Sequence, residues 1–225
     1  MIAGSFVAPF PTAAPIVVQA IGLRKQFGSI VALSGINLTA CRGESVGLIG
    51  PNGSGRTTLL RVLATLVAPT AGTVEIGGFD AVRHVREVRR RVVFIGSEFP
   101  PTHGLTVRQF LAWVQQTRGA AASADPRILE DAIARAELRD EAPVDLLSRG
   151  CRHRLAITAA LLVAPEVLLV DDALQALDER GRSRFIKWIR EVRERGMTVI
   201  AAVNDDASAR LLCDRNVRLA EGRLL

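Results

Sequence analysis

Continuous apolar runs recur along the chain, and each is bounded by glycine or by charged residues. Such short runs are typical of strands that are buried on both faces of a sheet. They predict strands at residues 46–49, 92–95, 167–172 and 197–203. Residues 16–78 contain further short strands with tight turns between them, among which residues 72–78 form a strand and a turn.

Between these runs, apolar residues recur with helical spacing. The pattern predicts helices at residues 57–63, 82–91, 126–138, 152–163 and 181–195, and another that opens within residues 105–111. Thr106 and Asp125 are candidate N-caps, and Pro126 suits the first turn of its helix. Because strands alternate with helices, the sequence predicts a fold of the α/β class.

The strand at residues 46–49 leads into a glycine-rich loop, residues 50–57, with the sequence G-P-N-G-S-G-R-T. It follows the pattern of a phosphate-binding loop, G-x-x-x-x-G-K-[ST], except that arginine replaces the lysine. Glycines let backbone N–H groups converge on phosphate oxygens, and the start of the next helix adds partial positive charge. The candidate nucleotide contacts are Gly50, Asn52, Gly53, Ser54, Gly55, Arg56, Thr57 and Thr58.

The strand at residues 167–172 ends in two carboxylates, Asp171 and Asp172. A carboxylate at the end of a strand beside a phosphate loop can hold Mg²⁺, directly or through water. The Thr57 hydroxyl is the second candidate Mg²⁺ ligand. An acidic strand end alone indicates only an ordinary turn, so this interpretation depends on the phosphate loop. Together the two motifs predict a site for Mg²⁺ and a nucleotide.

Further motifs in a characteristic order make the chain resemble the nucleotide-binding domain of ABC transporters over residues 16–225. Residues 147–151, L-S-R-G-C, resemble the signature LSGGQ of that family. Residues 175–178, Q-A-L-D, resemble the loop that follows the acidic strand, and residues 214–224 resemble the closing hairpin. Phe27 stands where the family stacks an aromatic ring on adenine. The resemblance is specific because several motifs occur in order across most of the chain.

The resemblance implies the fold of an ABC-type P-loop NTPase, with a RecA-like core sheet, an N-terminal antiparallel β subdomain and a helical subdomain at about residues 99–164. It also implies a second nucleotide-binding domain, identical or different, because the family holds each ATP between the phosphate loop of one domain and the signature of the other. The signature contacts would be Ser148, Arg149 and Gly150. Separate transmembrane subunits and a place at the cytoplasmic face of the cell membrane follow from the same resemblance.

Residues that the family places around the γ-phosphate differ in this chain. Arg56 replaces lysine, and a planar guanidinium is not equivalent to a compact ammonium at a tight site. Asp172 stands in place of the catalytic glutamate and is one methylene shorter. Asn204 replaces the switch histidine, and Ser97 replaces the glutamine that touches Mg²⁺ and the attacking water. Glu98 can take that role if the register shifts by one residue.

The signature differs as well: Arg149 replaces its first glycine and Cys151 its glutamine, whereas Ser148 and Gly150 remain. Taken together, the differences predict a protein that binds ATP and Mg²⁺ but by itself hydrolyses ATP slowly or not at all. Two functions remain open. The chain is either an ATP-binding subunit of an ABC transporter with impaired hydrolysis, or a non-catalytic ATP-binding module that regulates an active ABC subunit.

Composition agrees with this class. With 225 residues and 48% hydrophobic content, the chain can bury the core of one domain. It contains no run of about 20 apolar residues, the length that spans a bilayer. Residues 1–15 are rich in alanine and proline and lack the basic start of a signal peptide, so a flexible tail is expected.

The formal net charge is +6, and arginine is concentrated at residues 83–91 and 149–154. Aromatic residues do not interleave with these clusters and tyrosine is absent, which argues against nucleic-acid binding. The three cysteines lack metal-site spacing, which fits a reducing compartment, and the three histidines are scattered.

Overall fold

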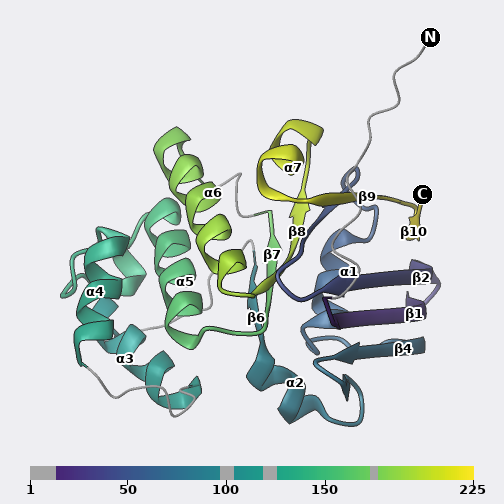
Figure 1. Cartoon of the computed structure of the whole chain (residues 1–225), viewed down its shortest axis with the longest axis horizontal. Coiled ribbons are helices and arrows are strands. Elements are labelled where there is room, and N and C mark those ends of the chain that lie inside the picture. Colours follow the sequence, from purple (N-terminus) through teal and green to yellow (C-terminus); the bar gives the residue numbers. More distant parts are fainter. Residues whose placement is uncertain (1–13, 97–103, 119–125, 173–176) are drawn as a thin grey trace.

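The computed structural model describes residues 14–96, 104–118, 126–172 and 177–225. These residues form two sheets and a group of helices that lies to one side of them (Figure 1). Most of the expected tail lies outside the described residues, as do Ser97, Glu98 and Asp125. The same is true of residues 175 and 176 in the loop after the acidic strand.

The first sheet is antiparallel and has the strand order β2-β1-β4-β5. Its strands are β1 (Ile16–Phe27), β2 (Ile30–Cys41), β4 (Ala71–Ile76) and β5 (Phe79–Asp80). Side chains alternate between its faces, so that Val18 and Ala20 are buried while Ile21 is exposed. This sheet is the predicted N-terminal antiparallel β subdomain, which is confirmed.

The second sheet carries the core of the α/β fold and has the order β10-β9-β3-β8-β7-β6. Its strands are β3 (Ser45–Ile49), β6 (Val92–Ile95), β7 (Val167–Asp171), β8 (Thr198–Val203), β9 (Arg215–Ala220) and β10 (Arg223–Leu224). All neighbouring strands are parallel except β9 and β10, which form the closing hairpin. The strands β3, β7 and β8 are buried along their whole length, which explains their continuous apolar runs.

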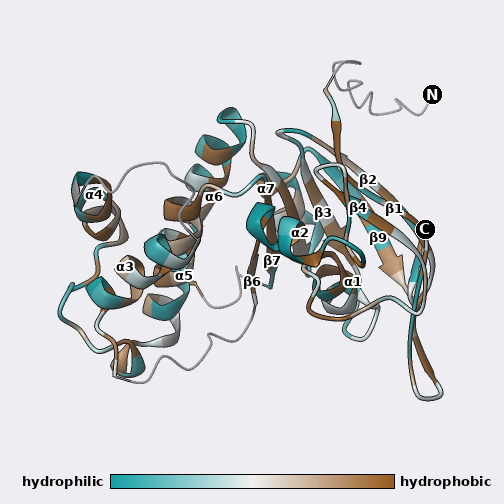
Figure 2. Ribbon diagram, turned by 90° about the horizontal axis from the view of Figure 1, so that it is seen from below, coloured by the Kyte–Doolittle hydropathy of each residue, from teal (hydrophilic) through white to brown (hydrophobic). Residues whose placement is uncertain are grey.

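Helices cover this sheet and also form a lobe of their own (Figure 1). The helices next to the sheet are α1 (Arg56–Leu63), α2 (Val85–Arg91), α6 (Glu179–Glu194) and α7 (Asp206–Leu212). The lobe consists of α3 (Val107–Arg118), α4 (Pro126–Ala136), the short 3-10 helix η1 (Val144–Leu146) and α5 (Arg149–Val163). Figure 2 shows that hydrophobic residues are concentrated along the strands and on parts of the helices, with hydrophilic residues on other parts of the helices. A separate apolar cluster that includes Phe110, Ile133 and Leu155 holds the lobe together.

Several helix boundaries differ from the predicted ones for local reasons. The helix predicted at residues 82–91 begins at Val85, because the Asp80 carboxylate accepts hydrogen bonds from the backbone N–H groups of Val82 and Arg83, both at 2.8 Å. That bonding favours a turn over a helix. The helix predicted at residues 126–138 ends at Ala136, since Glu137 adopts a left-handed φ of 50°.

Other boundaries bear on the candidate site. The helix predicted at residues 152–163 begins three residues earlier, at Arg149, so Arg149 and Gly150 belong to α5. The predicted cap at Thr106 is confirmed: the N–H of Gln109 donates to its hydroxyl at 3.2 Å, and the Gln109 side chain accepts from the Thr106 N–H at 3.0 Å. This reciprocal arrangement is a capping box.

Candidate functional site

The phosphate loop joins the end of β3 to the start of α1, and its glycines are required by space and by backbone conformation. A Cβ atom on Gly50 would lie 2.2 Å from the carbonyl oxygen of Leu219. One on Gly55 would lie 2.6 Å from the carbonyl oxygen of Ala32, at a φ of 106°. Gly53 has a φ of 80°, but a Cβ there would meet nothing within 4 Å. The backbone is therefore packed at both ends of the loop and open in its middle, where a phosphate would need space.

The first turn of α1 offers backbone donors to a ligand. Its N-cap, Gly55, has no side chain to accept a hydrogen bond, and the turn contains no acidic residue. The first N–H groups of a helix lack partners within the helix and favour an anion there. The hydroxyl oxygen of Ser54 is buried and has no hydrogen-bond partner among the described residues. These features fit a phosphate group.

Arg56, the residue in the lysine position, is turned toward the neighbouring strand. Its side chain is buried, with 6% of its surface exposed, and its Nη1 donates a hydrogen bond of 2.6 Å to the carbonyl oxygen of Val203. Val203 is the last residue of β8 and pairs with Ile49, the last residue of β3. The guanidinium is therefore bonded to the backbone at the end of the strand that precedes Asn204.

Thr57 and Asp171, the candidate Mg²⁺ ligands, are in direct contact. The Thr57 hydroxyl donates to Oδ1 of Asp171 at 3.1 Å, and Asp171 is buried. Burial raises the pKa of the Asp171 carboxyl above its usual value; the charge of Asp172 adds to the rise, while Thr57, Arg61 and Arg56 oppose it. A hydroxyl and a carboxylate supply hard oxygen ligands, so this pair fits Mg²⁺ held jointly with phosphate oxygens and water.

The structure also brings together Asp172 and Asn204, two of the three candidate catalytic residues. They line a cavity of about 50 Å³. Arg182 of α6, Asp205 at the N-cap of α7 and Ser208 of α7 also line this cavity. Asp172 has a φ of 51°, and its Oδ1 is buried without a hydrogen-bond partner among the described residues. Such a conformation is unusual for a residue other than glycine and stores strain. Ser97 lies outside the described residues.

Phe27, the candidate adenine contact, ends β1 and is 47% exposed. The ammonium of Lys25 lies 4.7 Å from the centre of its ring, a cation–π contact. The hairpin that carries Phe27 reaches the phosphate loop, since the start of β2 at Ala32 packs against Gly55. The hairpin that carries the aromatic ring is therefore packed against the loop through β2.

The signature residues lie at the start of α5. Ser148 is exposed, and its hydroxyl accepts a hydrogen bond of 3.3 Å from the N–H of Cys151. Gly150 is half-buried, and the backbone of Arg149 begins the helix. Figure 1 shows α5 in the helical lobe, on the other side of β6 and β7 from α1. The helix that begins with the signature thus lies across these strands from the helix that follows the phosphate loop.

Cys151 occupies an environment that favours its thiolate. Its sulfur accepts a hydrogen bond of 3.1 Å from the guanidinium of Arg154. The hydrogen bond with Ser148 lowers the pKa of the Cys151 thiol most, and Arg154 lowers it further, against an opposing effect of burial. By contrast, burial raises the pKa of the Cys213 thiol to about 12.

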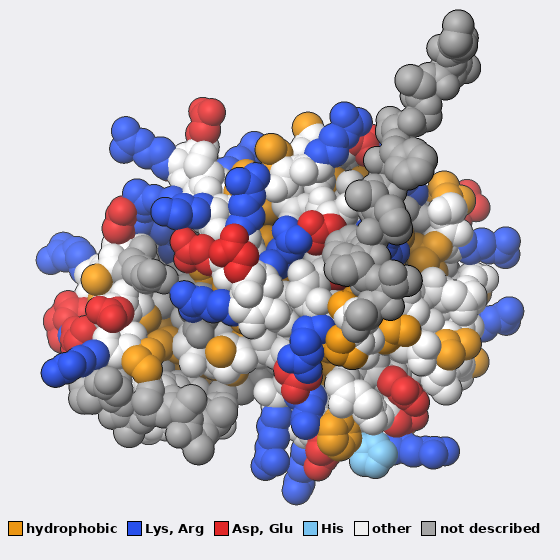
Figure 3. Space-filling view, viewed as in Figure 1, with side chains coloured by type: hydrophobic (Ala, Val, Ile, Leu, Met, Phe, Trp, Pro, Cys, Tyr) orange, Lys and Arg blue, Asp and Glu red, His pale blue; other side chains and the backbone are white. Residues whose placement is uncertain are grey.

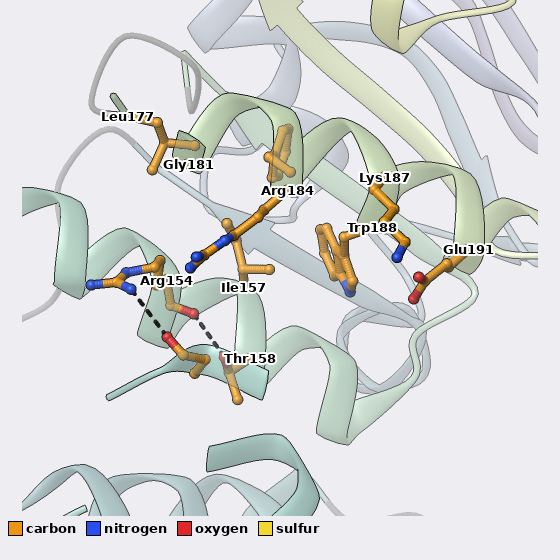
Figure 4. A pocket seen from close by; sticks show the side chains of 11 residues that line it. Arg154, Ile157, Thr158, Leu177, Gly181, Arg184, Lys187, Trp188 and Glu191 are labelled. Carbon is orange, nitrogen blue, oxygen red and sulfur yellow. Dashed lines mark hydrogen bonds between the residues drawn. The ribbon is translucent and has the colours of Figure 1, made fainter. Parts of the chain in front are cut away.

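A groove of about 270 Å³ runs between α5 and α6, next to the signature (Figure 4). Its apolar surface includes Ile157 and Trp188, and the indole N–H of Trp188 is buried without a partner among the described residues. Arg184 at its edge bonds to Glu137 at 2.7 Å. None of the candidate nucleotide residues lines this groove, so it is separate from the phosphate loop.

The arginines of the predicted basic cluster at residues 83–91 differ in their surroundings. Arg89 bonds to Thr65, and Arg91 contacts Glu166 and the ring of Phe79. Arg86 and Arg90 are exposed; Figure 3 shows basic side chains at the lower edge of the molecule, where Figure 1 places α2. Within the described residues, no helix combines the length and apolar character needed to cross a membrane.

Sequence reasoning missed two features of this site. The acceptor of Arg56 is a backbone carbonyl, which leaves no signature in the sequence. The helix α7 was not predicted, although its cap was visible as an aspartate, Asp205, followed three residues later by Ser208. The Asp205 carboxylate accepts a hydrogen bond of 2.7 Å from the N–H of Ser208. That cap fixes the chain directly after Asn204.

Known proteins are similar to this chain over most of its length. The profile of a family described as "ABC transporter" matches residues 33–175. The chain is 34% identical over 206 residues to the daunorubicin resistance ATP-binding protein DrrA3 of Streptomyces coeruleorubidus, covering 91% of this chain and 65% of that protein. It is 35% identical over 216 residues to the sulfate/thiosulfate import ATP-binding protein CysA of Brucella melitensis, covering 92% and 59%. The chain thus spans less than two thirds of the length of either relative.

Solved structures show the same architecture. An ATP-binding subunit of an ABC transporter superimposes with a TM-score of 0.87 at 23% identity, over 92% of this chain and 88% of that one, a likeness of fold. A dimeric ATP-binding cassette in a post-hydrolysis state, bound to ADP and Pi, superimposes with a TM-score of 0.82 at 26% identity, over 92% and 96%.

Proposed function

The chain belongs to the ABC transporter family, and from this premise we propose that it is an ATP-binding subunit that binds Mg-ATP to drive or regulate separate membrane subunits, with impaired hydrolysis. The observation that carries the proposal is the contact between Thr57 and Asp171, 3.1 Å apart at the start of α1 and the end of β7. It joins the phosphate loop to the acidic strand, as a Mg-nucleotide site requires.

In the proposed complex, the open backbone around Gly53 and the first N–H groups of α1 bind the β-phosphate. Ser54 offers to the same group its buried hydroxyl, which has no hydrogen-bond partner among the described residues. Thr57 and Asp171 would hold Mg²⁺, which would supply positive charge beside the phosphates. Phe27 offers its exposed ring to the adenine. Asn52 and Thr58 complete the set of loop residues that contact the nucleotide.

The position of the signature supports assembly from two domains. Because Ser148 and Gly150 lie in the helical lobe, away from α1, they are available to a nucleotide held by a second domain (Figure 1). The partner is a second ABC nucleotide-binding domain, identical or different, and Arg149 would stand at the same contact. We do not propose a role in nucleic-acid binding.

Hydrolysis is proposed to be impaired because the groups that would act on the attacking water are altered. Asp172 is shorter than glutamate, and a misplacement of about 1 Å can reduce a rate by roughly 100-fold. Asn204 can donate a hydrogen bond but carries no charge. Ser97 belongs to the same set of replacements. A non-catalytic regulatory module that pairs with an active ABC subunit is the second candidate, favoured by the left-handed backbone of Asp172 and by its Oδ1, which has no hydrogen-bond partner among the described residues.

The proposed organisation follows from the family and from the separate helical lobe of the fold. Residues 16–225 form the nucleotide-binding domain, with residues 1–15 as a tail, and the helical subdomain at about residues 99–164 passes the nucleotide state to the membrane subunits. The domain acts at the cytoplasmic face of the membrane as a peripheral subunit. These assignments rest on family membership and on the separate apolar core of the helical lobe.

The decisive experiment measures ATP binding and single-turnover hydrolysis by the purified chain and by a triple variant, Arg56→Lys, Asp172→Glu and Asn204→His. The chain is expected to bind Mg-ATP without turnover, and the variant is expected to gain turnover. Steady hydrolysis by the unmodified chain at about 1 s⁻¹ or faster, an ordinary enzymatic rate, would contradict impaired hydrolysis. Failure to bind ATP would contradict the proposed function itself.

A further inference from the structure

The groove between α5 and α6 is walled by one face of each helix. On α5, Arg154 and Ile157 are three residues apart and therefore lie on the same face. On α6, Lys187 and Trp188 follow Arg184 by three and four residues, so these side chains also share a face. Both faces line the space between the helices (Figure 4). The two walls of the groove are therefore regular helices.

The interior of the groove is mainly apolar. Its apolar lining consists of Ile157, Leu177, Phe185 and Trp188 together with alkyl parts of the charged side chains. The volume of about 270 Å³ lies near the lower end of the range of about 300–1,000 Å³ that is typical of small-molecule sites. The groove therefore suits a small molecule with an apolar body.

One polar atom in this apolar region lacks a partner. The indole N–H of Trp188 makes no hydrogen bond among the described residues, although the residue is only 7% exposed. In Figure 4 the indole extends from α6 towards α5, with its nitrogen at the far end of the ring. Nearly all buried donors in folded proteins have an acceptor, because an unsatisfied donor is unfavourable. A ligand that places an oxygen atom at this nitrogen would satisfy it.

The charged groups of the groove favour a negative ligand. Its charged lining residues are Arg154, Arg184, Lys187 and Glu191. A further carboxylate, that of Glu137, accepts a hydrogen bond of 2.7 Å from Arg184 and lies 3.9 Å from Arg154. Cations thus outnumber carboxylates by three to two in this set. The pair of Arg184 and Glu137 is 48% and 58% exposed and is therefore weak, and the guanidinium has further N–H donors to offer.

We propose that the groove between α5 and α6 binds a small amphipathic anion, a medium-chain carboxylate. Its hydrocarbon chain packs on Ile157 and Trp188, and its carboxylate lies among the cations. A carboxylate oxygen supplies both the acceptor that the Trp188 N–H lacks and the negative charge that the lining favours. The bound molecule contacts α5, which begins with the signature, and α6, which packs on the core sheet, and thereby connects the helical lobe to the core. No candidate nucleotide residue lines this groove, so the site acts without nucleotide.

The test is a titration of the isotopically labelled full chain with sodium octanoate, followed by NMR of the indole N–H groups. The chain has two tryptophans, and Trp113→Phe identifies the signal of Trp188. Octanoate is expected to move the Trp188 signal saturably, with a dissociation constant below about 1 mM. The signal of Trp113, which is 53% exposed on α3, is expected to stay in place. Octanol has the same chain length without the charge and should bind at least about tenfold more weakly, because charge-assisted hydrogen bonds are stronger.

Variants test the two sources of affinity separately. Lys187→Gln removes a cation from the groove and should weaken octanoate binding by about threefold or more. Arg190→Gln, at an exposed arginine of α6 that does not line the groove, is the matched control and should leave the affinity unchanged. Trp188→Phe keeps an aromatic ring but removes the N–H donor, and calorimetry should show about tenfold weaker binding.

Several results would overturn the proposal. One is a Trp188 signal that does not move in about 10 mM octanoate, and another is an equal movement of both indole signals. Equal affinity for octanoate and octanol would overturn the assignment of an anion. Movement of the Trp188 signal with protein concentration alone would show that a second copy of the chain covers the groove instead. These results come from the unmodified groove and decide the matter even if a variant does not fold, and ATP binding at the phosphate loop is judged independently.

Discussion

The Thr57 hydroxyl donates a hydrogen bond of 3.1 Å to the Asp171 carboxylate and thereby joins two segments that are 114 residues apart in the chain. One partner begins α1 and the other ends β7, so the contact depends on the order of the strands in the sheet. It also gives a hydrogen-bond donor to the buried Asp171 carboxylate, whose pKa is raised chiefly by burial. The same two groups are therefore important for stability and for the proposed Mg²⁺ site.

Replacing Thr57 by valine should reduce both the stability of the fold and the binding of Mg²⁺. The substitution keeps the shape of the side chain but leaves the buried carboxylate of Asp171 without its hydroxyl donor, which costs about 1–3 kcal/mol. Urea denaturation measures this loss, with Thr58→Val at the next position as the control. We also expect Mg²⁺ to lose most of its effect on nucleotide affinity in Thr57→Val. Equal stability of the two variants would contradict the importance of the contact.

The glycines of the phosphate loop should differ in their response to alanine. Gly50→Ala places a methyl group 2.2 Å from the Leu219 carbonyl oxygen, so the backbone must move and nucleotide binding should be lost. Gly53→Ala has no such neighbour within 4 Å and should cost only about 1–2 kcal/mol for its left-handed conformation. Thermal denaturation of both variants without nucleotide checks this order, because a methyl group on Gly53 would enter the space assigned to the phosphate and reduce nucleotide binding for that separate reason. A larger loss of thermal stability in Gly53→Ala than in Gly50→Ala would show that the space beside Gly53 is occupied in solution.

Most of the framework could be predicted because it depends on local patterns. Continuous apolar runs predicted the buried strands, and Val92–Ile95 has the predicted bounds. The loop at residues 50–57 was recognisable from glycine spacing. The contact of Arg56 with Val203 could not be predicted, because the acceptor is a backbone oxygen brought near by the pairing of β3 and β8. Likewise, α7 is short and depends on the Asp205 cap more than on periodicity.

The cysteines should react with alkylating agents at different rates. The thiolate is the reactive form, and the pKa of Cys151 is lowered by Ser148 and Arg154, whereas burial raises that of Cys213 to about 12. At pH 7, iodoacetamide should therefore modify Cys151 before Cys213, as peptide mass spectrometry can show. Arg154→Met should slow the reaction of Cys151 and shift its pH profile upward. Faster modification of Cys213 would contradict the packing of that side chain.

The N-cap of α7 predicts that the stability of the fold depends on pH through one carboxyl group, that of Asp205. Hydrogen bonds from the backbone and side chain of Ser208 hold the pKa of the Asp205 carboxyl below its usual value, the backbone bond having the larger effect. A carboxyl group with a depressed pKa in the folded state stabilises the fold above its unfolded pKa and loses that contribution as the pH falls through its folded pKa.

Replacement of Asp205 by alanine should therefore cost about 0.5–2 kcal/mol at pH 7, as is usual for an N-cap. The difference in stability between the two proteins should shrink as the pH is lowered below 3.8, the ordinary pKa of an aspartate, because the carboxylate of the unmodified chain then becomes protonated. Urea denaturation over a series of pH values measures it, with Asp206→Ala in the first turn of the same helix as the control for charge alone. A cost that stays constant down to the lowest pH at which the chain folds would show that Asp205 acts through its packing and not through its charge. If the cap also positions Asn204, the residue before it, then Asp205→Ala should change nucleotide affinity as well, while Asp206→Ala should not.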